Sequence, residues 1–259
     1  MANMFTFNFG RSFSEARPVA DVIAFALPRT LFLFGGALVF EYVAGIFLGR
    51  FIAWHRGRVE GAVVLSGLFF YNMPSFWIGL ILLWAFAFAV PIFPLAGYSD
   101  VTWTHQHFPS LALGSAAFQI TDVVMHGVLP MLALVLISSA GTILLMETSM
   151  LEVLGEDFVL TARAKGLSAR RVRNHHVARN AYLPIVTTFA ISLGFVIGGA
   201  IILEQIFSYY GMGWYLLSSI VKQDNMLAGG ILFLISVLVI VGNIVADVLY
   251  GVLDPRVRI

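Results

Sequence analysis

Long apolar runs alternate with short polar segments along most of this chain. Five of these runs are rich in Leu, Val, Ile, Phe and Ala, and each approaches or exceeds the about 20 residues that cross a bilayer as a helix. They cover residues 28–50, 62–90, 126–148, 184–204 and 227–250. No internal repeat and no linker rich in Gly, Ser or Pro divides the chain. The pattern predicts an all-α, polytopic transmembrane helical bundle with five spans, formed by a single domain over residues 1–259.

One polar segment, residues 156–184, stands out between the third and fourth runs with the sequence EDFVLTARAKGLSARRVRNHHVARNAYLP. Acidic residues at its start (Glu152, Glu156 and Asp157) favour the beginning of a helix, because they complement the positive end of the helix dipole. Gly166 predicts the end of that helix, since glycine readily adopts the left-handed conformation of a helix terminus. Ser168 can cap a second helix. We therefore expect a helix, a tight bend and another helix.

Pro184, at the end of the same segment, suits the first turn of the next apolar helix. Between Ala162 and Ala181 the segment carries six Lys and Arg residues and no acidic residue. One interpretation is a basic loop that binds anionic lipid at about 1 kcal/mol per charge. A lipid-binding loop needs charge but no bent pair of helices, so the bend favours a second interpretation, a knob that inserts into another protein.

The distribution of charge predicts the topology. The chain is 59% hydrophobic and 11% charged, far below the roughly 25% charged residues of soluble domains. Of its 15 Lys and Arg, 11 lie in residues 50–58, in the basic segment or near the C-terminus, which predicts that these three segments are cytoplasmic. Residues 1–27, read as an exposed lead-in, and residues 91–125, which lack Lys and Arg, are expected outside the cell. No signal peptide is recognisable, so an external N-terminus suggests that a first span is missing.

Four stretches of the sequence resemble one family. They are TARAKGLSARRV (161–172), RNAYLPIVT (179–187), LEQIFSYYGMG (203–213) and NIVADVLYGVLDPRVR (243–258). Together they resemble the membrane-spanning permease subunits of ATP-binding cassette (ABC) importers, in the branch that carries dipeptides and oligopeptides and also nickel and oligosaccharides. The chain departs from the family pattern at Leu160-Thr161-Ala162, where Glu-Ala-Ala is usual. Tyr210 also replaces a proline, and Asn72 replaces a serine.

The resemblance implies a role for the basic segment, whose residues 156–180 would form the cytoplasmic coupling loop that contacts an ATPase. The ATPase-coupling residues would be Thr161, Ala162, Arg163, Ala164, Lys165, Gly166, Leu167 and Ser168. It also implies a second, similar permease subunit, two cytoplasmic ATP-binding subunits and an external solute-binding protein as partners, in the cell membrane, with the C-terminus in the cytoplasm. Peptide is the expected solute, with nickel chelate and oligosaccharide as alternatives.

The chain itself should not be an enzyme. It has no G-x4-G-K-[ST] phosphate-binding loop, so ATP hydrolysis must come from partner subunits. There is no cysteine. The histidine pairs His105 with His107 and His175 with His176 lack a third ligand at a recognisable spacing, so we expect no metal and no cofactor.

Three residues are candidates for the translocation path: Glu41, Asn72 and Pro74. Glu41 is an ionisable residue near the middle of a span, where charge is unfavourable and often functional. Pro74 should break its span and free backbone groups that face protein or water.

Three carboxylates lie nearer the span ends: Glu147, Glu204 and Asp247. Their side chains are expected to reach the membrane–water interface. The pairs Gly45-x3-Gly49 and Gly194-x3-Gly198 allow close helix approach, and the sequence leaves open whether a second subunit is involved.

Two other functions compete with the importer subunit. A stand-alone proton-coupled carrier would use Glu41 and Asp247, but such carriers have inverted repeats and broken helices in both halves, which the sequence lacks. A membrane enzyme would gather its titratable groups near one face, whereas the histidines and carboxylates here are spread over both.

Overall fold

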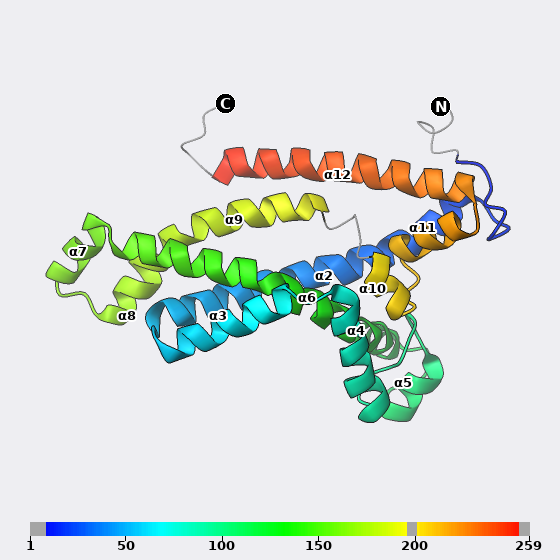
Figure 1. The fold of residues 1–259 in the computed structure, drawn as a ribbon, viewed down its shortest axis with the longest axis horizontal. Coiled ribbons are helices and arrows are strands. Elements are labelled where there is room, and N and C mark those ends of the chain that lie inside the picture. The colour runs from blue at the N-terminus through cyan, green and yellow to red at the C-terminus, as the bar shows by residue number, and fades with distance from the viewer. Residues whose placement is uncertain (1–8, 196–200, 254–259) are drawn as a thin grey trace. The chain divides into compact units, whose positions relative to one another are not determined.

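The structure is a computed structural model that describes residues 9–195 and 201–253. Within these residues all the named secondary-structure elements are helices (Figure 1). The all-α prediction is confirmed. The helices are α2 (Val19–Trp54), α3 (Arg58–Tyr71), α4 (Ser75–Leu83), η1 (Trp84–Ala89), α5 (Val101–His107), α6 (Ala116–Leu154), α7 (Asp157–Ala164), α8 (Ala169–Arg171), η2 (Val172–Val177), α9 (Ala178–Phe195), α10 (Ile201–Ile206), α11 (Met212–Val221) and α12 (Asn225–Leu253). The two elements η1 and η2 are π-helical.

Three helices of the described residues are long and apolar enough to cross a membrane: Val19–Trp54, Ala116–Leu154 and Asn225–Val245. A fourth candidate is the pair Arg58–Tyr71 and Ser75–Ala89, which is either one broken span or a re-entrant loop. Pro74 lies at this break with φ −59° and ψ 132°, as the residue before α4, so the predicted interruption is confirmed. The run 184–204 lies partly outside the described residues, and the count of five spans stays a prediction.

The chain forms two compact units. Unit 1 comprises Met1–Ala37, Pro74–Leu134 and Phe195–Ile240, and unit 2 comprises Leu38–Met73, Val135–Gly194 and Val241–Ile259. The long helices α2, α6 and α12 each pass from one unit into the other.

The core of unit 1 joins the start of α2 to α11 and to the first half of α12. Its buried residues are Phe9, Val19, Val22, Ile23, Ala26, Met212, Tyr215, Leu216, Leu227, Ile231 and Leu234. The expectation of an exposed lead-in with a helix that starts at Pro28 is therefore wrong for part of this segment. Helix α2 begins nine residues earlier and contains Pro28, because apolar residues 19, 22, 23 and 26 repeat at helical spacing and pack on that core.

A buried carboxylate fastens the segment before α2 to the N-terminus of α12. Asp224 is fully buried and accepts hydrogen bonds from Ser12 Oγ at 2.6 Å, Ser14 Oγ at 2.9 Å and Leu227 N at 3.1 Å. Burial alone raises the pKa of this carboxyl, but the hydrogen bonds outweigh it and lower the pKa to about 2. Asp224 thus remains ionised at neutral pH.

In unit 2, helices α2 and α6 pack closely through two glycines. A methyl group on Gly45 would lie 2.6 Å from Thr142 Cγ2, and one on Gly49 would lie 2.6 Å from the carbonyl oxygen of Ile143. Only glycine allows this approach, so the predicted close contact through Gly45 and Gly49 is confirmed and lies within the chain. The second pair, Gly194 and Gly198, extends outside the described residues.

Candidate functional site

The basic segment folds as the predicted helix, bend and second helix. Helix α7 ends at Ala164, and Gly166 follows with φ 75°, in the left-handed region. Gly166 N donates to Arg163 O at 2.9 Å and Leu167 N donates to Ala162 O at 3.4 Å, which is the hydrogen-bond pattern of a Schellman motif. Nothing lies within 4 Å of a methyl group added to Gly166. Backbone conformation alone therefore favours glycine there.

The second helix begins at the predicted cap. Ser168 has extended backbone angles, and its hydroxyl accepts from Arg171 N at 3.4 Å. The helical backbone then runs through α8, η2 and α9 to Phe195. Pro184 is therefore an interior residue of α9 and not a first-turn residue, which corrects the prediction. Glu152 also differs from its prediction, because it belongs to the end of α6, while Glu156 and Asp157 begin α7.

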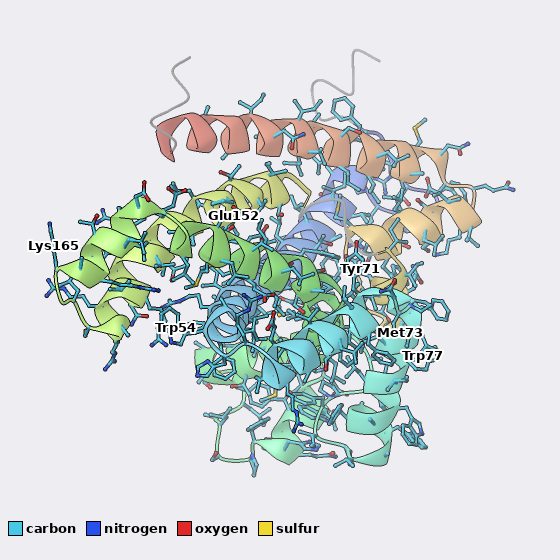
Figure 2. The ribbon with its side chains drawn as sticks, turned by 60° about the vertical axis from the view of Figure 1, so that its left-hand side comes forward. Trp54, Tyr71, Met73, Trp77, Glu152 and Lys165 are labelled. Carbon is cyan, nitrogen blue, oxygen red and sulfur yellow. The ribbon has the colours of Figure 1, made fainter. Side chains whose placement is uncertain are left out.

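Most of the predicted coupling residues are available to a partner. Thr161, Arg163, Ala164, Lys165, Gly166 and Ser168 are exposed, Leu167 is half-buried and Ala162 is buried at 5% exposure. Figure 2 shows Lys165 at the end of unit 2 that α7 and α8 form, pointing away from the helices. Within the described residues, no ion pair involves a cation of this segment. Its positive charge is therefore free to attract an acidic partner.

An apolar edge accompanies this charge. Phe158 is 41% exposed and Leu160 is 57% exposed, both on α7. Buried Val159 and Ala162 hold the other face of α7 in unit 2. Helix α7 and the bend after it thus combine exposed apolar side chains with the exposed cations Arg163 and Lys165, which is typical of a surface that contacts protein.

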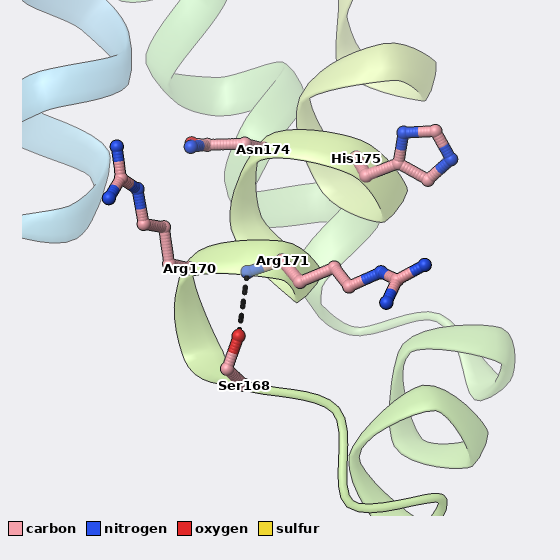
Figure 3. Close-up of a pocket in the computed structure, with 5 residues that line it drawn as sticks. All are labelled: Ser168, Arg170, Arg171, Asn174 and His175. Atoms are coloured by element: carbon pink, nitrogen blue, oxygen red, sulfur yellow. Dashed lines mark hydrogen bonds between the residues drawn. The ribbon is translucent and has the colours of Figure 1, made fainter.

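A surface pocket of about 360 Å³ lies at the start of the second helix. Its lining residues are Ser168, Arg170, Arg171, Asn174 and His175. Figure 3 shows Arg170 and Asn174 pointing to one side of the helix, and Arg171 and His175 to the other. The lining holds two arginines and no carboxylate, but the two guanidinium groups point to opposite sides and do not converge on one ligand.

The motif LEQIFSYYGMG (203–213) is organised around a carboxylate that the sequence analysis misjudged. Glu204 on α10 is fully buried in unit 1, so the expectation that it reaches the interface is wrong. Its Oε1 accepts from Thr30 Oγ1 at 2.9 Å and its Oε2 accepts from Trp214 N at 2.8 Å. Thr30 Oγ1 also accepts from Met212 N at 2.8 Å. Glu204 and Thr30 therefore connect α10, α2 and the start of α11.

The two glycines of the motif make room for this carboxylate. A methyl group on Gly211 would lie 2.5 Å from Thr30 Oγ1 and 2.6 Å from Glu204 Oε1. One on Gly213 would lie 2.9 Å from the Cα of Ile201 and 3.0 Å from Glu204 Oε2. Sequence reasoning missed Thr30, because it lies 174 residues from Glu204 and no local pattern marks it.

The carboxylate Glu147 also differs from its prediction. It is 5% exposed, on α6, so it does not reach the surface of the structure. The side chain of Asp247 lies outside the described side chains.

The three candidates for the translocation path have separate local roles. Glu41 is half-buried and accepts from Thr142 Oγ1 at 2.9 Å. Asn72 is exposed and ends α3, where its Nδ2 donates to Leu68 O at 2.7 Å. Pro74 is exposed and precedes α4. No described contact joins Glu41 to Asn72, and a path along these residues stays a prediction.

The polar loop before α6 is anchored by another acidic residue that the sequence analysis did not single out. Asp122 is 3% exposed and accepts from Ser99 Oγ at 2.5 Å and Thr104 Oγ1 at 2.7 Å. His126 Nδ1 donates to Asp122 O at 2.7 Å, one turn earlier in α6. The described residues hold no group of three or more His, Cys, Asp or Glu suited to a metal ion.

Residues 41–259 match the protein family described as binding-protein-dependent transport system inner membrane component. The whole chain is 34% identical to the di/tripeptide transport system permease protein of Pseudomonas aeruginosa, over 79% of that protein. It is 34% identical to the dipeptide transport system permease protein of Escherichia coli K12, over 97% of this chain and 77% of the relative. The oligopeptide transport system permease protein of Bacillus subtilis is 31% identical, over 100% of this chain and 78% of the relative.

Proposed function

Because this chain belongs to the family of binding-protein-dependent inner membrane transport components, we propose that it forms half of a translocation path for peptides. The family makes it a membrane-spanning permease subunit of an ABC importer, a transport protein and not a stand-alone carrier. Peptide as the solute is supported by the names of its relatives, which transport di- and tripeptides, dipeptides and oligopeptides.

The bent knob carries the proposal for how this subunit is driven. Residues 156–180 present an exposed, unpaired basic surface with the apolar residues Phe158 and Leu160 beside it, held in one shape by the Gly166 bend. We propose that this loop inserts into a cytoplasmic ATPase through Thr161–Ser168, and that closure of the ATPases moves the loop as a lever. In this account the chain is one permease domain, with residues 1–27 external and the C-terminus cytoplasmic.

The proposed complex contains a second permease subunit, two ATP-binding subunits and an external solute-binding protein. Isolation of the affinity-tagged chain from its native membranes tests this composition by mass spectrometry. We expect two ATPase chains to accompany it. The isolated complex in liposomes should hydrolyse ATP and import radiolabelled dialanine when the binding protein is supplied.

The chain purified alone serves as the control. It should neither hydrolyse ATP nor move dialanine, because it lacks a phosphate-binding loop. Uptake by the chain alone under a pH gradient would restore the carrier hypothesis built on Glu41 and Asp247. Import of a nickel chelate or an oligosaccharide in place of dialanine would overturn peptide as the solute.

A further inference from the structure

A π-helical turn lies inside the 156–180 loop, between the Gly166 bend and helix α9 that follows. Element η2 (Val172–Val177) lies between α8 and α9, and the residues at its two ends, Arg171 and Ala178, both have right-handed helical backbone angles. The helix is therefore continuous but locally widened. Such turns are rare inside α-helices and are frequent at functional sites. A push on the knob must cross this turn before it reaches α9.

A single guanidinium from α2 bonds both that turn and the helix α9 that follows it. Arg50 Nη1 donates to Tyr182 Oη at 2.5 Å, and Arg50 Nη2 donates to Asn174 Oδ1 at 3.2 Å. Asn174 belongs to η2 and Tyr182 to α9, so the two bonds join α2 to both elements within unit 2. A planar guanidinium fixes the direction of both bonds at once, which a lysine ammonium does not.

A second contact from α2 supports the first. The guanidinium of Arg173 lies 5.3 Å from the ring centroid of Trp54, and Arg173 Nε donates to Asn174 Oδ1 at 3.1 Å. Arg50 and Trp54 are four residues apart, and so lie on the same face of α2. The last turns of α2 therefore meet η2 through two side chains, Arg50 against Asn174 and Trp54 against Arg173.

Charge neutralisation does not account for Arg50. Within the described residues no carboxylate pairs with it, and both of its acceptors are neutral oxygens. What Arg50 fixes is the spacing between the π turn, α9 and α2. If the knob moves along the axis of α9, it must carry α2 with it or break both hydrogen bonds.

We propose that Arg50 is the positioning residue that transmits movement of the 156–180 loop to α2. This inference rests on the proposed function, since it requires an ATPase to move the loop. Movement of the loop would reach α2 through the side chain of Arg50. It would reach α9 through the backbone, because α9 continues the helix of the loop.

The test uses the tagged complex with its ATPases, and compares the wild type with Arg50→Gln and Arg50→Lys. We expect both variants to retain the ATPases and to import about fivefold less dialanine, or less still, per ATP hydrolysed. Lysine should not rescue the glutamine variant's defect, because it keeps the charge without the paired geometry. Tyr182→Phe should reduce import per ATP as well, and adding it to Arg50→Gln should cause little further loss.

Arg58→Gln is the matched control, because the substitution removes the same positive charge. Arg58 is exposed at the start of α3 in the same unit. It should behave as wild type. Full rescue by lysine, or an unchanged ratio in Arg50→Gln, would overturn the inference.

A distance measurement reads the same coupling without any solute. The chain lacks cysteine, so spin labels can be attached to cysteines at positions 40 and 191, which are exposed on α2 and α9 of unit 2. When the complex is trapped with ATP and vanadate, the distance between the two labels should stay constant in the protein that has Arg50. In the Arg50→Gln variant the same distance should change. A distance that responds identically in both would contradict the inference. A wild-type complex without ATPases would instead contradict the proposed function.

Discussion

Three buried carboxylates organise polar contacts of unit 1, each by collecting donors from separate segments. Glu204 binds Thr30 and Trp214, Asp224 binds Ser12 and Ser14, and Asp122 binds Ser99 and Thr104. A buried carboxylate without such partners would be strongly destabilising, whereas one that accepts several hydrogen bonds fixes the geometry of all its donors. Mutations at these residues should therefore act on structure before they act on transport.

Gly211→Ala tests the space beside Glu204. The added methyl group would lie 2.5 Å from Thr30 Oγ1 and 2.6 Å from Glu204 Oε1, so one of these groups must move and lose hydrogen bonds. We expect the free energy of unfolding to decrease by about 2 to 4 kcal/mol, because of overpacking and the lost hydrogen bonds. Thermal unfolding of the detergent-purified protein should show a midpoint lower by several degrees. Gly141→Ala is the control, since nothing lies within 4 Å of its added methyl group, and an equal decrease there would contradict this account.

The hydrogen bonds that attach residues 12–14 to Asp224 should weaken at acid pH. The pKa of Asp224 falls from 3.8 in the unfolded reference to about 2 in the folded protein, so its contribution to stability is complete above about pH 4 and disappears as the pH falls through 2. Pepsin works throughout this range, and cleavage within residues 9–18 should accelerate between pH 4 and pH 2. Asp224→Asn should be cleaved faster at pH 4 and lose most of this pH dependence. Equal cleavage of both proteins at pH 4 would contradict the prediction.

At the scale of elements, the two irregular turns of the basic segment are stabilised in different ways. The Gly166 bend sets the shape of the knob through backbone conformation, and its geometry is local. The π turn η2 is held from outside by Arg50 and Trp54 of α2. A change at the Gly166 bend should therefore leave the packing of unit 2 intact. A change at η2 should disturb that packing, because η2 contacts α2.

Gly166→Val tests the bend. Valine is strained at φ 75°, by about 1 to 3 kcal/mol, and should relieve the strain by straightening the bend. Membrane insertion should survive, but the subunit should either lose its ATPases or keep them without solute-stimulated hydrolysis and uptake. Arg170→Gln, which removes charge and leaves the bend, should have the milder effect. Normal transport by Gly166→Val together with failure of Arg170→Gln would favour the lipid-binding interpretation.

For the whole molecule, the distribution of Lys and Arg predicts which segments face the cytoplasm. Position 170 should be inside, and position 113, in the segment 91–125 without Lys or Arg, should be outside. Both positions are exposed in the structure. Because the chain has no cysteine, single cysteines at these positions are clean probes. An impermeant maleimide applied to intact cells should label position 113 only, and labelling of position 170 from outside would reverse the topology.

The sequence by itself determined the all-α membrane class, the importer family and the helix-bend-helix form of the basic segment. These features depend on hydrophobic run length, on motif residues close together in the chain and on the local preferences of Gly166 and Ser168. Local patterns set the wrong start for α2, because the periodicity of residues 19–26 gains its stability from a core that α11 and α12 supply.

Only the tertiary structure decided which distant polar groups meet. Thr30 and Glu204 are 174 residues apart, and Arg50 and Tyr182 are 132 residues apart. From the sequence alone, Glu204 was a carboxylate near a span end and Arg50 was one more charge in a segment predicted to be cytoplasmic. The reason is physical: a hydrogen bond has a range of about 3 Å, so its partner is chosen by the packing of helices and leaves no periodic signal along the chain.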